Sequence, residues 1–169
     1  GEERDPESKS VSFFCLDARS GIVRWHNVRL NEPWWISVEG VHGGIVVVHE
    51  YASPNMPGHR KIHALDLASG NVLWTNNELE FLFVHDSRLY AGKDLFDSRL
   101  FFELDLETGA VGRELDSGDV SALRREVVAS EPNIVDFPFP YDCSASTHPR
   151  VRAAVEKVTA AAREPGLIE

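Results

Sequence analysis

The sequence predicts a mainly β fold, an antiparallel meander of four-stranded units followed by a C-terminal α-helix. Three observations predict it. The phrase Leu-Asp-x-x-Ser/Thr-Gly-x-Val occurs three times, β-rich runs fill the stretches between its copies, and one amphipathic helical stretch follows them. The Asp of the phrase stands at positions 17, 66 and 105, so the copies are 49 and then 39 residues apart. Periods of this length are typical of stacked or radial repeat architectures.

Each copy of the phrase predicts a β-hairpin. Its Ser-Gly or Thr-Gly supplies a residue that tolerates a positive φ angle, and its Asp accepts hydrogen bonds from backbone amides two or three residues further on. We therefore assign the Asp to the turn and not to catalysis. The strands expected on the two sides of each turn are 11–16 and 22–25, 61–67 and 71–74, and 100–106 and 110–115.

Further strand pairs are expected between the copies, where β-branched and aromatic residues gather. Gly40 and the pair Gly43-Gly44 separate the first two of these runs, and Asp86-Ser87 separates the second two. Together the runs form a continuous meander of about ten strands through Leu115. The additional strands are expected at 34–38, 45–51, 81–85 and 88–91.

The repeated phrase also resembles a known family. Its second copy, residues 62–74, reads Ile-His-Ala-Leu-Asp-Leu-Ala-Ser-Gly-Asn-Val-Leu-Trp. This pattern resembles the repeat of quinoprotein-type β-propellers, also called PQQ-like repeats, over roughly residues 11–115. Two to three repeats are present, because the third copy has Arg113 where the repeat has Trp. The resemblance implies that each four-stranded unit is one blade and that the Trp packs between adjacent blades.

The number of repeats is small for a propeller, since closed propellers have about 4–8 blades. An open stack of blades exposes apolar faces and unpaired strand edges. Three outcomes stay open at this point. Two chains close one ring, the chain is a fragment of a larger propeller, or the sheet folds into a compact form capped by its own tail.

Three parts of the chain are expected. Residues 1–10 are a flexible N-terminal segment, 11–116 are the propeller-like β-repeat region, and 117–169 are a Pro-punctuated segment with a C-terminal capping helix. Within the third part, residues 117–128 fit either a short helix or the start of another strand. The capping helix is expected at 150–163, where apolar residues recur at helical spacing between Pro149 and Pro165-Gly166.

Composition excludes some classes of partner. The formal net charge of −10 argues against nucleic acid, which requires a basic surface. No apolar run reaches the ~20 residues that cross a bilayer, so we expect no membrane insertion. The protein is expected to be soluble, and the sequence leaves a cytoplasmic or a periplasmic location open. Cys15 and Cys143 are too few for a disulfide framework, and whether they pair also stays open.

No chemistry-bearing motif emerges from the sequence. The spacing of His42, His49, His59 and His63 matches no common zinc pattern, and along an extended strand His59 and His63 lie about 13 Å apart. Quinoprotein dehydrogenases, which the repeat resembles, hold their cofactor with a disulfide between adjacent cysteines, and here no cysteines are adjacent. We therefore assign no catalytic, cofactor-binding or metal-binding residues and expect no cofactor.

The leading interpretation is a non-enzymatic interaction or scaffold module. It follows the resemblance, because several PQQ-like propellers are scaffolds. The partner is expected to be another protein or a second copy of the chain in a homodimer. The alternative is a small-molecule-binding protein or degenerate enzyme with a pocket near Trp34, Trp35, His42 and His49.

Overall fold

A computed structural model describes residues 1–53 and 56–130 of the chain, and all described elements belong to one compact unit, Gly1–Ser130. Within it, strands alternate with short turns up to residue 115, and one helix follows. The elements are β1 (Glu2–Asp5), β2 (Ser10–Leu16), β3 (Val23–Val28), β4 (Ile36–His42), β5 (Ile45–Ser53), β6 (Met56–Asp66), β7 (Val72–Asn76), β8 (Glu80–His85), β9 (Arg88–Asp94), β10 (Arg99–Asp105), β11 (Val111–Leu115) and α1 (Ser117–Ser130).

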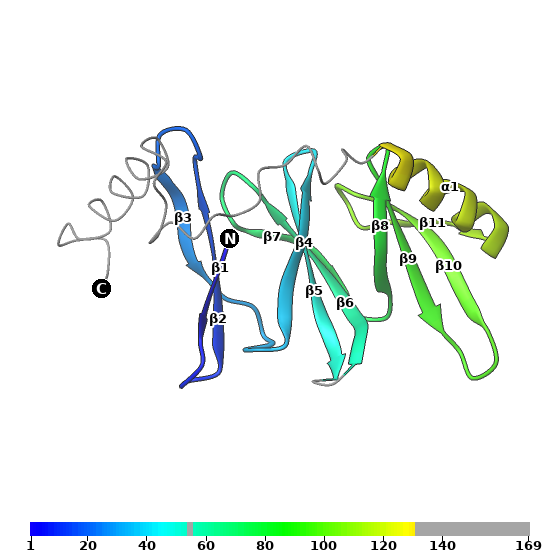
Figure 1. Cartoon of the computed structure of the whole chain (residues 1–169), viewed down its shortest axis with the longest axis horizontal. Helices are drawn as coiled ribbons and strands as arrows, with labels where there is room; N and C mark the ends of the chain where they lie inside the picture. Colours follow the sequence, from blue (N-terminus) through cyan, green and yellow to red (C-terminus); the bar gives the residue numbers. More distant parts are fainter. Residues whose placement is uncertain (54–55, 131–169) are drawn as a thin grey trace, which may run out of the picture. The chain divides into compact units, whose positions relative to one another are not determined.

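The strands form three antiparallel sheets that follow one another along the chain (Figure 1). The first sheet has the order β1-β2-β3, the middle sheet β4-β5-β6-β7 and the third sheet β11-β10-β9-β8. The mainly β prediction is confirmed, and all ten expected strands are present, with ends that shift by up to five residues, as for β6, which begins at Met56. The first sheet has three strands, where a four-stranded unit was expected. No helix in residues 1–53 and 56–130 is long and apolar enough to cross a membrane.

The N-terminal residues differ from the expected flexible segment, because β1 pairs with β2 in the first sheet. Gly1 and Phe14 exchange hydrogen bonds, in which Phe14 N donates to Gly1 O at 3.0 Å and the Gly1 amino group donates to Phe14 O at 2.8 Å. Arg4 on β1 donates to the backbone carbonyls of Trp34 and Ile36. These partners are distant in sequence, so the polar composition of the segment does not reveal them.

The three repeated turns have the structure that their sequence predicts. Asp17 Oδ1 accepts hydrogen bonds from the Arg19 and Ser20 amides at 3.0 and 2.9 Å. Asp66 and Asp105 accept the corresponding amide bonds in the second and third turns. The glycines of the turns are Gly21, Gly70 and Gly109, with φ angles of 74°, 75° and 70°.

A Trp joins each of the first two sheets to the next one. Trp25 Nε1 on β3 donates to Leu67 O in the second turn at 2.9 Å, and Trp74 Nε1 on β7 donates to Leu106 O in the third turn at 3.0 Å. We call this contact the Trp–turn joint. It confirms that the Trp of the repeat packs between adjacent sheets.

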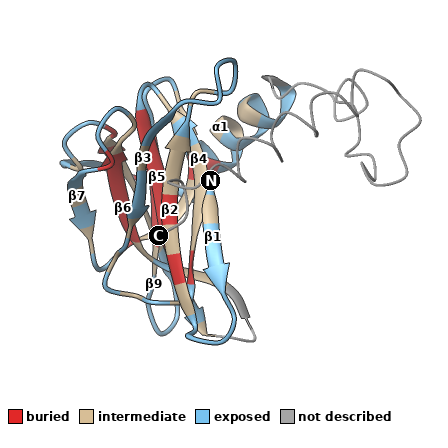
Figure 2. Cartoon of the chain, turned by 90° about the vertical axis from the view of Figure 1, so that its left-hand side faces the viewer, coloured by how far each residue is buried: buried red, intermediate tan, exposed pale blue. Residues whose placement is uncertain are grey.

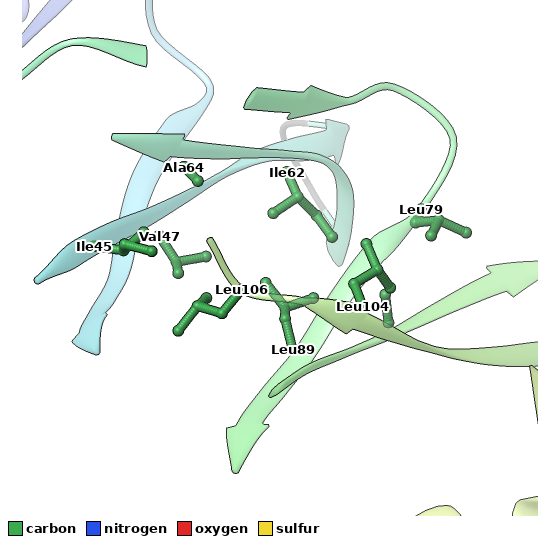
Figure 3. Close-up of a cluster of buried hydrophobic side chains, with 9 residues drawn as sticks. Ile45, Val47, Ile62, Ala64, Leu79, Leu89, Leu104 and Leu106 are labelled. Carbon is green, nitrogen blue, oxygen red and sulfur yellow. The ribbon is translucent and has the colours of Figure 1, made fainter. Parts of the chain in front are cut away.

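Two apolar cores lie between the sheets. The side chains drawn in Figure 3 come from β5 and β6 of the middle sheet and from β9 and β10 of the third sheet, together with Leu79 just before β8 and Leu106 just after β10. A second cluster joins β2 to the middle sheet through Phe13, Ile36, Val48 and Leu65. Buried residues accordingly concentrate on inner strands such as β5 and β6 (Figure 2).

Helix α1 occupies the region that the sequence left undecided between helix and strand. Asp116 caps it by accepting a hydrogen bond from the Asp119 amide at 2.8 Å. Val120, Leu123 and Val127 recur at helical spacing and pack with Phe83, Tyr90 and Leu115 of the third sheet. The helix expected at 150–163 lies outside the described residues and stays a prediction.

Candidate functional site

Three polar side chains from adjacent strands of the middle sheet meet at one place. Glu39 lies on β4, His49 on β5 and His59 on β6. Glu39 Oε1 lies 2.7 Å from His49 Nδ1 and 3.0 Å from His59 Nδ1. One potential ligand atom from each residue lies within 4.8 Å of the other two. We call this group the Glu–His–His cluster.

Two irregularities in strand pairing assemble the cluster. The β4–β5 register skips Glu39, and the β5–β6 register skips Lys61, whose φ angle is 51°. An extra residue in one strand reverses the alternation of its side chains beyond that point. His59 therefore lies on the same face as His49, whereas His63 lies on the opposite face.

The rings of the cluster pack tightly. The centroids of the His49 and His59 rings are 3.8 Å apart and their planes are inclined by 22°. The edge of Tyr51 meets His49 at a centroid distance of 4.5 Å. The side chain of His49 is 4% exposed, that of Glu39 19% and that of His59 28%, so the cluster opens to solvent mainly beside His59.

Several polar atoms of the cluster lack a hydrogen bond. Glu39 Oε1 and His49 Nδ1 are close together, but their directions do not meet the geometry of a hydrogen bond. Glu39 Oε1 has a second polar neighbour, His59 Nδ1 at 3.0 Å, but neither Glu39 Oε1 nor His49 Nδ1 has a well-aligned hydrogen bond, and His49 Nε2 is also buried without one. Buried polar atoms nearly always have a partner in native proteins, so these three atoms require an explanation.

The protein environment changes the acidity of two members. Burial acts to raise the pKa of Glu39, but the polar contact with His49 and the charges of both histidines outweigh it, and the pKa lies below its ordinary value. Burial and the neighbouring His49 lower the pKa of His59, although Glu39 and a hydrogen bond to the backbone of Phe81 oppose this. An anionic Glu39 beside a neutral His59 is therefore favoured near neutral pH.

A second polar cluster lies on the opposite face of β5, around the fully buried Glu50. The carboxylate of Glu50 lies 3.1 Å from Lys61 Nζ and 3.3 Å from Arg60 Nε. His63 Nε2 lies 3.2 Å from it, and His63 Nδ1 is hydrogen-bonded to Thr75 Oγ1 at 3.0 Å. A buried charge is tolerated when it is paired in this way, which gives this cluster a structural role.

Stability is expected to fall as the pH decreases below about 6.5. Burial lowers the pKa of His42, His59 and His63 from the ordinary value of 6.5 in the folded chain. Each of these histidines has a pKa of about 6.5 in the unfolded chain and a lower pKa in the folded chain. At a pH between these two values, the unfolded chain binds one more proton per histidine than the folded chain. The contribution of each histidine to stability is therefore fully present above about pH 6.5 and is lost as the pH falls toward the pKa in the folded chain. Each group contributes at most about 1.4 kcal/mol per pH unit within its window. Urea unfolding at about pH 7.5 and about pH 5.5 measures this loss, and higher stability at the lower pH would contradict it.

The residues of the expected small-molecule pocket do not converge. Trp34 packs against the core between the first and middle sheets, beneath the Lys9 ammonium at 4.9 Å from its ring, and Trp35 is 38% exposed. His42 is at the far end of β4, roughly 20 Å along the strand from Trp35. There it lines a separate hollow of about 280 Å³ together with His85 and Ser87, among others. His49 belongs to the Glu–His–His cluster.

Sequence reasoning missed the Glu–His–His cluster because it compared histidines along one strand. The separation of His59 from His63 argued against a shared ion, and the structure agrees that these two residues are apart. The relevant pair is His49 with His59, which meet across neighbouring strands. The sequence did show that Glu39, His49 and His59 lie in three strands that follow one another in the meander. Their alignment depends on the two bulges, which the sequence did not reveal. The expectation of no metal-binding residue is not tested by this geometry.

The first repeated turn lacks the contact that the other two turns make. A Cβ atom built on Gly70 would lie 2.8 Å from Trp25 Cδ2, and one on Gly109 would lie 2.5 Å from Trp74 Cδ2. A Cβ on Gly21 would have no described atom within 4 Å. Beside this turn, residues of the first and middle sheets, including Phe14, Leu16 and Leu67, line an apolar pocket of about 430 Å³.

The model of a family described as a domain of unknown function, DUF4905, matches residues 2–74, which is less than half of the chain. No curated protein matches the sequence. Among solved structures, the crystal structure of BamB from Moraxella catarrhalis is similar, with 16% sequence identity over 69% of this chain and 64% of that chain and a TM-score of 0.18. The chain thus spans less than two thirds of that structure, and a TM-score this low supports no argument about function.

Proposed function

We propose that the chain is a PQQ-like, propeller-type repeat module without enzymatic activity, and that it binds another protein through its first sheet. The observation that carries this proposal is that a Trp covers the second and third turns but no described Trp covers the first turn. The first turn has the same Asp and the same positive-φ Gly as the other two, but no described Trp ring lies on it.

The exposure of the Leu residue before each turn supports the view that the first turn is uncovered. Leu65 and Leu104, which precede the Asp of the second and third turns, are both 0% exposed. The equivalent Leu16 in the first sheet is 45% exposed. Covering it would remove apolar surface from water, which favours association. The surface formed by Leu16, Ala18 and Gly21 is hereafter called the open turn.

The other end of the described unit is not equivalent. Arg113 stands in β11 where the repeat has Trp, and it forms an ion pair with Glu103 at 3.3 Å. Helix α1 packs on the third sheet through Val120 and Leu123. The described part of a second copy thus has Arg113, not a Trp, at the position equivalent to Trp74. This favours, as the partner, a different protein whose last sheet carries a Trp at the position of Trp74, and it argues against the homodimer.

A peptide titration tests the open turn. The probe is the hexapeptide Asn-Val-Leu-Trp-Thr-Asn with blocked ends, which has the sequence of residues 71–76. We expect its addition to shift the NMR amide signals of residues 18–21 in the ¹⁵N-labelled chain. The equivalent signals of residues 67–70 and 106–109 should stay in place, because Trp25 and Trp74 already occupy those turns.

Two controls decide the outcome of this titration. A hexapeptide with Ala in place of Trp should produce no shift at the open turn, and the variant Leu16→Lys should lose the response to the Trp peptide. Equal shifts at all three turns, or none at residues 18–21 at the highest soluble peptide concentration, would overturn the proposal. A stable dimer in light scattering that Leu16→Lys abolishes would instead identify a second copy as the occupant.

A further inference from the structure

We propose that Glu39, His49 and His59 bind one divalent transition-metal ion of the zinc class. This site is independent of the open turn, since it lies on the face of the middle sheet next to β8, where the His59 ring is hydrogen-bonded to the backbone of Phe81. In the described part of the chain, it is the one group of His, Cys, Asp and Glu side chains whose ligand atoms gather this closely.

The donor set suits such an ion. Two imidazole nitrogens and one carboxylate oxygen are ligands that zinc and its first-row neighbours accept. Tetrahedral zinc with bonds of about 2.0–2.1 Å places neighbouring ligand atoms roughly 3.3 Å apart. The Nδ1–Oε1 distances of 2.7 and 3.0 Å are slightly shorter than this. A small opening of the cluster around an ion would bring both to the required spacing.

The buried atoms that lack a well-aligned hydrogen bond also support a metal ion at this place. Glu39 Oε1 lies within 3.0 Å of the Nδ1 atoms of both histidines, yet neither Glu39 Oε1 nor the buried His49 Nδ1 has a well-aligned hydrogen bond. His49 is nine-tenths or more buried, so water does not supply the missing partner freely. An ion between these atoms would satisfy both at once, with His59 as the third ligand.

The surroundings hold the ligands and leave a path to them. His59 also has a polar contact with the backbone of Phe81, the kind of outer contact that orients a metal-ligating histidine. Tyr51 packs its ring edge against His49 and fixes that ring. The more exposed side chain of His59 provides access from solvent. Three protein ligands leave a fourth position for water or another molecule.

Metal titration of the full chain tests this site. After removal of metal with a chelator, Zn²⁺ is titrated in a calorimeter and Co²⁺ is followed by its visible absorption. We expect one ion per chain and Co²⁺ bands typical of a four- or five-coordinate nitrogen and oxygen site. His59→Asn and Glu39→Gln should each weaken binding by about 100-fold or more, since even outer-shell changes cost 10–100-fold.

The matched control is His42→Asn, which changes another partly buried histidine of the same sheet and should leave the affinity unchanged. Each variant is first checked for folding by circular dichroism. If a ligand variant does not fold, X-ray absorption of the Zn²⁺-loaded wild-type chain decides, because two imidazole rings give a recognisable scattering pattern. Absence of binding to the wild-type chain, equal binding to the ligand variants, or a spectrum without two imidazoles would overturn the proposal.

Discussion

Trp74→Ala is expected to lower the free energy of unfolding by about 3 kcal/mol or more, in the range of large-to-small core substitutions. The ring of Trp74 packs against the core between the middle and third sheets. It also covers Gly109 and donates a hydrogen bond to Leu106 O. Its loss leaves a cavity and removes this hydrogen bond from the joint. Equilibrium urea unfolding, followed by circular dichroism, measures the change.

Trp35→Ala is the control for this substitution. Trp35 is 38% exposed and precedes β4, outside both Trp–turn joints. Its replacement should cost about 1 kcal/mol or less, as for substitutions away from a packed core. Equal losses for the two variants would contradict a special role of Trp74 in joining the sheets.

Gly109→Ala is expected to lower the free energy of unfolding by about 2–5 kcal/mol. A side chain at φ 70° costs about 1–2 kcal/mol because the left-handed region disfavours a Cβ atom. The new Cβ would also lie 2.5 Å from Trp74 Cδ2, and overpacking of this kind costs about 1–3 kcal/mol. Urea unfolding again gives the magnitude.

Gly21→Ala separates these two effects. Gly21 has a φ angle of 74°, nearly that of Gly109, but no described atom lies within 4 Å of the position of its Cβ. It should therefore show only the backbone cost of about 1–2 kcal/mol. If Gly21→Ala were as destabilising as Gly109→Ala, the first turn would be covered and the open turn would not exist.

The fold was largely predictable because its signals are local. The Asp-to-Gly span of each turn contains both its hydrogen-bond acceptor and its positive-φ residue, so the turns at Asp17, Asp66 and Asp105 formed as expected. A hairpin then follows from the strands on either side. The Trp25 and Trp74 contacts join residues 42 and 32 positions apart, so they were expected only from the resemblance to PQQ-like repeats.

The features that sequence reasoning did not predict depend on partners far along the chain. Strand β1 is held by Phe14 and by the backbone of residues 34–36, and a polar composition does not reveal such partners. The Glu–His–His cluster depends on bulges at Glu39 and Lys61, which reverse the side-chain alternation. Regular alternation would have placed His59 and His63 on one face.

The double variant Trp74→Ala with Gly109→Ala tests the central claim, that a Trp seated on a Gly turn joins successive sheets. The steric part of the Gly109→Ala cost requires the Trp74 ring, so it should disappear when the ring is absent. The double variant should then be more stable than the sum of the two single losses predicts, by about 1–3 kcal/mol. Losses that add within about 0.5 kcal/mol would show that the two residues do not interact and would contradict the joint.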